Sequence, residues 1–91
     1  MEFDWDEQKS AWTLDRRGFA YEFASRIFEG PVLERLDRRR EYGESRVQAI
    51  GSVEGDILFV VYTDRDHVRR IISARRARKK ERELWLSFAS R

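Results

Sequence analysis

The chain has 91 residues, 41% of them hydrophobic and 40% charged, which predicts one small globular domain over residues 1–91 rather than a disordered chain. The net charge is only +2, there is no cysteine and there is one histidine, so disulfides, thiolate metal sites and structural zinc are not expected. No apolar run is long enough to span a membrane and the acidic start "MEFDWDEQ" is unlike a signal peptide, so a cytoplasmic location is expected.

The first third of the chain is predicted to be helical. One helix is expected over "DEQKSAWTLDRR", with Asp4 or Asp6 as its N-cap and Gly18 as its left-handed terminator. A second helix is expected over "AYEFASRIFE", where apolar residues recur at helical spacing until Gly30 and Pro31 stop it. The buried side of these helices is expected to comprise Trp5, Trp12, Leu14, Phe19, Phe23 and Phe28.

The rest of the chain is predicted to form four strands and a helix. Residues 32–36 suit a short edge strand, whereas residues 46–53, 57–63 and 68–74 are joined by turns so short that they must pair antiparallel. Residues 57–63 are apolar on both sides, which places them centrally. The segment "RKKERELWLSF" returns to a helix, with an apolar stripe made by Ala77, Leu84, Trp85 and Phe88.

The expected fold class is therefore α+β. Two N-terminal helices would pack on one face of a four-stranded antiparallel sheet. The C-terminal helix would follow, free to pack on the sheet or to be captured by a partner.

Positive charge is concentrated near the C-terminus. Residues 1–44 hold 8 basic and 11 acidic residues, residues 45–64 hold 1 and 3, and residues 65–91 hold 10 and 3, a balance of +7 in the last segment. Such a segment on a nearly neutral chain indicates a polyanion or an acidic protein as partner, and the alternative is a solvated, salt-bridged helix face. On a helix, Arg78, Arg82 and Trp85 would share one face, where guanidinium groups bind phosphate and an aromatic ring stacks on an unpaired base. This pattern favours single-stranded RNA, with Arg76 as a further contact.

Several stretches taken together resemble the BrnT family of bacterial toxins, in a likeness that runs from Phe3 to about Trp85. They are Trp5-Asp6 with Lys9, Gly43-Glu44-Ser45-Arg46, Val61-Tyr62-Thr63, and Arg70-Ile71-Ile72-Ser73-Ala74-Arg75 with Glu81-Arg82 beyond. The chain departs from the family pattern twice. Arg16-Arg17-Gly18 stands where members often have Lys-His-Gly, and Ala20 stands where a serine often caps the second helix.

The resemblance implies a RelE-like ribonuclease fold and a toxin of a type II toxin–antitoxin pair. The expected activity is that of a metal-independent, cofactor-free endoribonuclease that cuts RNA and stops translation. The resemblance also implies a BrnA-like antitoxin with a ribbon-helix-helix part, which masks the basic site and carries the complex to operator DNA. No membrane partner is expected.

RNA cleavage does not require the protein to supply a nucleophile, because the 2′-hydroxyl of the RNA is an internal one. The protein must align it, stabilise the charge on the phosphate and move protons. Arg75 and Arg82 are the candidates for charge stabilisation. Glu81 is the candidate general base, since neighbouring positive charge would keep it ionised. The alternative for Glu81 is an intrahelical pair with Arg78 or Arg82.

Three further residues have both a functional and a structural interpretation. Lys9 matches a recurrent family position and is a catalytic candidate that could reach a phosphate across the sheet. Arg46, at the start of a strand, is an RNA-binding candidate; for both, an ordinary surface charge is the alternative. His67 beside a turn is expected to be a solvated residue more than an acid or base.

Two rival hypotheses remain open. With Arg17 in place of the histidine, the chain could be a degenerate toxin homologue that acts only as an antitoxin-binding co-repressor or nucleic-acid-binding module. Alternatively, the basic segment could bind duplex DNA directly, with a steep dependence on salt.

Overall fold

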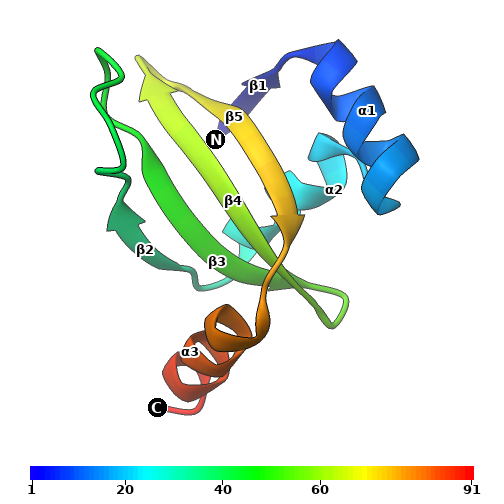
Figure 1. Ribbon diagram of the computed structural model, residues 1–91, viewed down its shortest axis with the longest axis vertical. Coiled ribbons are helices and arrows are strands. Elements are labelled where there is room, and N and C mark those ends of the chain that lie inside the picture. Colours follow the sequence, from blue (N-terminus) through cyan, green and yellow to red (C-terminus); the bar gives the residue numbers. More distant parts are fainter.

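Five strands form one mixed sheet in the order β1-β5-β4-β3-β2 in the computed structural model, which describes residues 1–91 (Figure 1). Strands β2 to β5 pair antiparallel, whereas β1 runs parallel to β5. The elements in chain order are β1 (Glu2–Trp5), α1 (Glu7–Arg17), α2 (Tyr21–Ser25), the 3₁₀ helix η1 (Arg26–Glu29), β2 (Leu33–Leu36), β3 (Val47–Val53), β4 (Asp56–Arg65), β5 (Val68–Arg76) and α3 (Lys79–Ala89). None of the helices is both long and apolar enough to cross a membrane.

Strand β1 corrects the prediction of a four-stranded antiparallel sheet. Its register runs from Glu2 opposite Val68 to Trp5 opposite Ile71. Phe3 and Trp5 turn toward the core, while the acidic residues that alternate with them, Glu2 and Asp4, face outward. Four alternating residues directly before a helix cap are too short a signal for a strand, and a parallel partner so distant in the sequence leaves no local trace.

Helix α1 begins and ends where the sequence predicts. The Asp6 carboxylate caps it by accepting hydrogen bonds from the backbone N–H groups of Gln8 at 2.9 Å and Lys9 at 3.3 Å. Gly18 ends it with φ of +85°, and its N–H donates to the carbonyl of Leu14 at 3.0 Å. A left-handed residue in this position is the usual glycine terminator.

The second predicted helix is only partly formed. Helix α2 has five residues and then tightens into η1. Ala20 supplies no side-chain acceptor, and the first backbone N–H, that of Tyr21, donates instead to Ser10 Oγ of α1 at 2.9 Å. The predicted edge strand, central strand and hairpins are confirmed, and Glu54 and Gly55 form the β3–β4 turn with φ of 50° and 87°.

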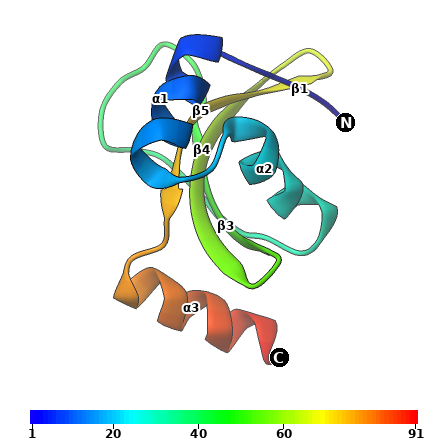
Figure 2. The ribbon, with the colours of Figure 1, turned by 90° about the vertical axis from the view of Figure 1, so that its right-hand side faces the viewer.

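The larger core lies between the sheet and the pair α1–α2 (Figure 2). It comprises Phe19, Tyr21, Ala24, Ile27, Ala49, Val53, Leu58, Val60, Tyr62, Ile71 and Ala74. Gly51 of β3 allows η1 to approach closely, because a Cβ there would lie 2.7 Å from the Cβ of Ile27. Phe23, Phe28 and Trp5 only partly enter this core.

Trp12 and Leu14 are about half exposed, which contradicts their predicted burial. Helix α1 contacts the core through the small buried residues Ser10 and Thr13 instead. The guanidinium of Arg17 lies 5.2 Å from the centre of the Trp12 ring, so the ring is covered by cations rather than by the sheet.

Helix α3 covers the opposite face of the sheet, at the end away from α1 (Figure 1). Trp85 forms a second core with Ile50, Phe59 and Val61, and Phe88 packs against it. Along β3, Ile50 alternates with Ala49 and Gly51 of the larger core, so the two cores lie on opposite faces. The C-terminal helix is thus packed on the sheet, although Leu84 of its predicted apolar stripe is exposed.

Candidate functional site

The predicted charge-stabilising residue Arg75 and the predicted base Glu81 meet at the junction of β5 and α3. Nη1 and Nη2 of Arg75 donate to Oε1 and Oε2 of Glu81 at 2.7 and 2.9 Å. The two side chains are 22% and 19% exposed, and the Arg75 guanidinium lies 4.1 Å from the centre of the Phe59 ring. A bidentate ion pair stacked on an aromatic ring holds the guanidinium in one orientation.

Glu81 is ionised and also fixes the start of α3. Its Oε1 accepts the backbone N–H of Arg78 at 2.7 Å. The hydrogen bonds from Arg75, followed by the one from the Arg78 backbone, hold the pKa of the Glu81 carboxyl below its ordinary value. The side-chain partner of Glu81 is thus Arg75 on β5, and the predicted intrahelical pairs with Arg78 or Arg82 do not form.

The predicted common face of Arg78, Arg82 and Trp85 does not form. Arg78 is the N-cap residue of α3, and the Arg82 guanidinium donates to the carbonyl of Ala77 at 2.7 Å. Trp85 is 5% exposed and buried against the sheet. An RNA base cannot stack on Trp85 in this fold, because the Trp85 ring is buried and anchors α3 to the sheet.

Lys9 and Arg76 lie at the open edge of β5, away from the Arg75–Glu81 pair. β1 pairs with β5 only as far as Ile71, and the carbonyl of Ile72 beyond it accepts Lys9 Nζ at 2.6 Å. Arg17 similarly donates to the carbonyl of Ala74 at 2.7 Å, and Arg76 donates to the carbonyl of Arg17. Lys9 and Arg17 thus satisfy carbonyls of an unpaired strand edge, and Arg76 satisfies the last carbonyl of α1, which are structural functions.

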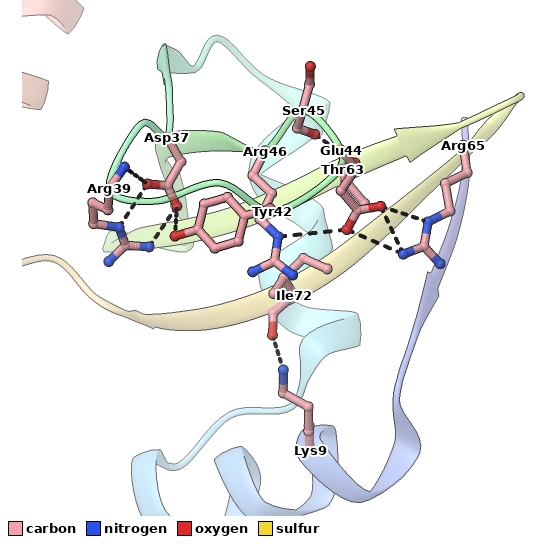
Figure 3. A network of polar contacts seen from close by, with 10 residues as sticks. All are labelled: Lys9, Asp37, Arg39, Tyr42, Glu44, Ser45, Arg46, Thr63, Arg65 and Ile72. Carbon is pink, nitrogen blue, oxygen red and sulfur yellow. Dashed lines mark hydrogen bonds and ion pairs between the residues drawn. The ribbon is translucent and has the colours of Figure 1, made fainter.

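Arg46 lies on the same sheet face as α3, because it precedes Val47 of the larger core by one residue. Its guanidinium lies beside the Tyr42 ring (Figure 3), at 4.1 Å from the ring centre. Its Nε is buried 3.7 Å from the Glu44 carboxylate and makes no hydrogen bond. Glu44 is instead bound by Arg65 at 3.0 Å, which leaves a donor of Arg46 unused.

The loop between β2 and β3 is organised by Asp37, a residue that the sequence did not single out. Its carboxylate accepts Nε and Nη2 of Arg39 at 2.8 and 2.7 Å and the Tyr42 hydroxyl at 3.3 Å (Figure 3). The Arg39 guanidinium holds the pKa of this carboxyl far below its usual range. The sequence signal for this loop was the basic run Arg38-Arg39-Arg40 directly after Asp37, since an aspartate often hydrogen-bonds the backbone of the loop that it begins.

A pocket of about 220 Å³ opens between α3 and the sheet beside Glu81. It is lined by Leu33, Glu34, Arg35, Gln48, Ile50, Phe59, Glu81 and Leu84. Of the predicted residues, Arg75, Arg78, Glu81 and Arg82 therefore gather at one junction, with Arg46 on the same face. His67 lies in the exposed β4–β5 turn, and no three His, Cys, Asp or Glu side chains are grouped to hold a metal ion.

A known protein family matches most of the chain. The sequence model of a family described as "Ribonuclease toxin, BrnT, of type II toxin-antitoxin system" matches residues 5–81. The match covers both halves of the Arg75–Glu81 pair and the whole of strands β2 to β5. No curated protein matches the chain.

Proposed function

The chain belongs to the BrnT family, the ribonuclease toxins of type II toxin–antitoxin systems, and we propose that it cleaves single-stranded RNA on the sheet face beside α3. Membership of a type II toxin–antitoxin family implies an RNA target and a protein antitoxin. The observation that supports this location is the Arg75–Glu81 pair, which joins an oriented cation and an ionised carboxylate at the rim of a pocket.

In the proposed reaction the 2′-hydroxyl of the RNA attacks the adjacent phosphorus, and the bond to the 5′-oxygen of the next nucleotide breaks. Negative charge accumulates on the phosphate oxygens. Arg75 has five N–H donors, of which two bind Glu81 and one binds the Arg76 carbonyl, so two stay free for the phosphate. Because Glu81 and Phe59 already fix its orientation, little reorganisation is needed when the charge develops.

Glu81 is the proposed acceptor of the 2′-hydroxyl proton. It is ionised at neutral pH, and its Oε2 accepts only one hydrogen bond within the protein. The second lone pair of Oε2 is the position for an incoming proton. Water would protonate the leaving 5′-oxygen. No step in this scheme calls for a metal ion, so the proposed activity is metal-independent.

The remaining basic residues of the junction would hold the RNA. We assign Arg82 to charge stabilisation, and Arg46 and Arg78 to binding of the phosphate backbone. Arg46 has an unused buried donor, and Arg78 has no side-chain partner in the protein. Lys9 and Arg76 are assigned to the β5 edge, because a role in RNA contact would cost their backbone acceptors a partner.

A degenerate homologue that serves only as an antitoxin-binding co-repressor is the second candidate. The observation in its favour is that the Glu81 carboxylate already accepts three hydrogen bonds, an arrangement that also suits a purely structural ion pair. The partner proposed for either function is a BrnA-like antitoxin with a ribbon-helix-helix part, through which the pair would bind operator DNA.

Expression in a bacterium, with and without the neighbouring gene, tests the proposed function. Growth arrest with loss of RNA and of protein synthesis, rescued by co-expression of the neighbour, is the expected result. The variant R75A should permit growth, and the matched variant R16A, on exposed α1, should arrest it like the parent. Growth without arrest by the soluble, folded parent chain would instead support the co-repressor.

A further inference from the structure

A second pocket continues the one beside Glu81 along the edge of the sheet. It has a volume of about 570 Å³ and is lined by Arg35, Leu36, Arg38, Arg39 and Gln48. Arg35 and Gln48 line both pockets, so the two form one groove. Its lining residues extend from α3 along β2 to the loop that follows β2. This loop leaves β2 at the end away from α3 (Figure 1).

Positive charge in this second pocket is not neutralised. Arg38 makes no ion pair or hydrogen bond, and Arg35 binds only the neutral amide of Gln48, through Nε at 2.7 Å. Arg39 alone faces an acid, Asp37, so three arginines and one aspartate leave a balance of +2. Of the other arginines on the sheet, Arg65, Arg69, Arg70 and Arg75 each pair with an acid, as Arg69 does with Asp64 at 2.8 Å, and only Arg76 does not.

Two of these arginines, Arg35 and Arg39, are also held in place before any ligand arrives. Gln48 is buried, so the amide that fixes Arg35 is itself rigid. The Asp37 side chain is excluded from solvent, whereas the Arg39 side chain whose guanidinium it holds is 63% exposed. Outward-facing donors that are already oriented lose little side-chain entropy when they bind an anion.

The groove alternates between charged and apolar lining. The Arg35–Arg38–Arg39 pocket is basic, whereas the pocket beside Glu81 has apolar walls made by Leu33, Ile50, Phe59 and Leu84. From Leu33 to Leu36 the strand covers about 10 Å at roughly 3.3 Å per residue. A single RNA strand has a charged backbone and uncharged, unstacked bases, and this lining matches both.

We propose that Arg35, Arg38 and Arg39 form a phosphate-binding subsite. It would hold the RNA strand whose scissile phosphate lies beside Arg75. The proposal rests on the ribonuclease function proposed above. Guanidinium forks bind phosphate oxygens, and the Gln48 amide nitrogen, which donates to no protein group, can contact a base or a 2′-hydroxyl. An acidic protein segment is the competing occupant, and the test below distinguishes it from RNA.

The test measures binding of a 2′-O-methyl single-stranded oligonucleotide, which lacks the attacking hydroxyl, by fluorescence anisotropy at several salt concentrations. The variant R35A/R38A is compared with R16A/R26A. Both variants remove two positive charges, but Arg16 and Arg26 lie on α1 and η1, against the other face. The single variant R38A is measured as well, in case the double variant does not fold. R38A should fold like the parent, because Arg38 makes no hydrogen bond or ion pair.

The subsite predicts an affinity at least about tenfold lower for R35A/R38A than for R16A/R26A. It also predicts a salt slope that is smaller by about 1.4, or roughly 0.7 for each phosphate that the variant no longer neutralises. Equal affinities and slopes for the two variants, with tight binding by the parent chain, would overturn the subsite and leave the ribonuclease function standing. A parent chain that binds no oligonucleotide but binds a poly-glutamate peptide through Arg38 would overturn both.

Discussion

Substitution of Glu81 separates its proposed chemical role from its structural one. Ala at this position removes two charge-assisted hydrogen bonds to Arg75 and the acceptor of the Arg78 backbone N–H. With the ion pair about a fifth exposed, its removal should cost about 1–2 kcal/mol and removal of the helix cap about 1 kcal/mol. Gln has the same shape, with an NH₂ group in place of one oxygen, and its remaining oxygen can still accept the Arg78 N–H, so it should cost only about 1 kcal/mol.

The two variants should therefore rank differently in stability and in catalysis. In urea unfolding, E81A should lose about 2–3 kcal/mol, which in a domain of this size lowers the melting temperature by roughly 10–20 °C. E81Q should remain folded at 25 °C yet cleave a fluorescent single-stranded RNA about 10²–10⁴-fold more slowly, because an amide cannot accept the proton. R75A is the companion variant, and R16A is the control in which the site is unaltered.

The pH dependence follows from the lowered pKa of Glu81. Its ion pair with Arg75 contributes stability that is present above the pKa of Glu in the unfolded chain, about 4.3, and is lost as pH falls through the lower folded value. The parent should accordingly lose stability and activity in acid, and E81Q should show a smaller loss of stability there. If folded E81Q cleaved RNA as fast as the parent, Glu81 would be a positioning residue for Arg75 and the proton-transfer role would be refuted.

Three further substitutions test the fold that positions the site. G51A should lose roughly 1–3 kcal/mol in urea unfolding, since its Cβ would lie 2.7 Å from the Cβ of Ile27; an unchanged midpoint would mean that η1 moves freely. W85A should lose about 3–5 kcal/mol by emptying the second core, and unaltered amide exchange in α3 would contradict this packing. D37N should lower the free energy of unfolding above about pH 4, because Arg39 lowers the pKa of Asp37 in the folded chain. The stability of the variant should also fall less than that of the parent in acid. If the free energies of unfolding of both chains fell equally with pH, the linkage would be refuted.

The sequence predicts the elements whose signals are local. Asp6 and Gly18 bound α1 as expected, and the turn at Glu54 and Gly55 joins two strands whose alternation is clear. Strand β1 is missed because its partner, β5, lies far along the sequence even though the two are neighbours in the sheet. Trp12 is misplaced because helical spacing does not reveal which face of a short helix meets the sheet, and here Ser10 and Thr13 do so.

The candidate site was predictable in composition but not in pairing. The basic run around Arg75 and the acid Glu81 are evident in the sequence, yet their contact depends on the chain turning between β5 and α3. Trp85 has the spacing of a stacking residue, and only the packed helix shows it to be a core residue. The groove along Arg35 and Arg38 needs the loop that Asp37 closes, which no periodicity signals.

Cleavage of single-stranded RNA by the purified chain in excess EDTA, with R75A and R16A measured in parallel, is the decisive experiment for the proposed ribonuclease site. The proposed mechanism predicts cleavage that persists in EDTA, leaves 2′,3′-cyclic phosphate ends, falls about 10²-fold or more in R75A and is unchanged in R16A. Intact RNA with a folded parent chain, or R75A that cleaves as fast as R16A, would contradict it.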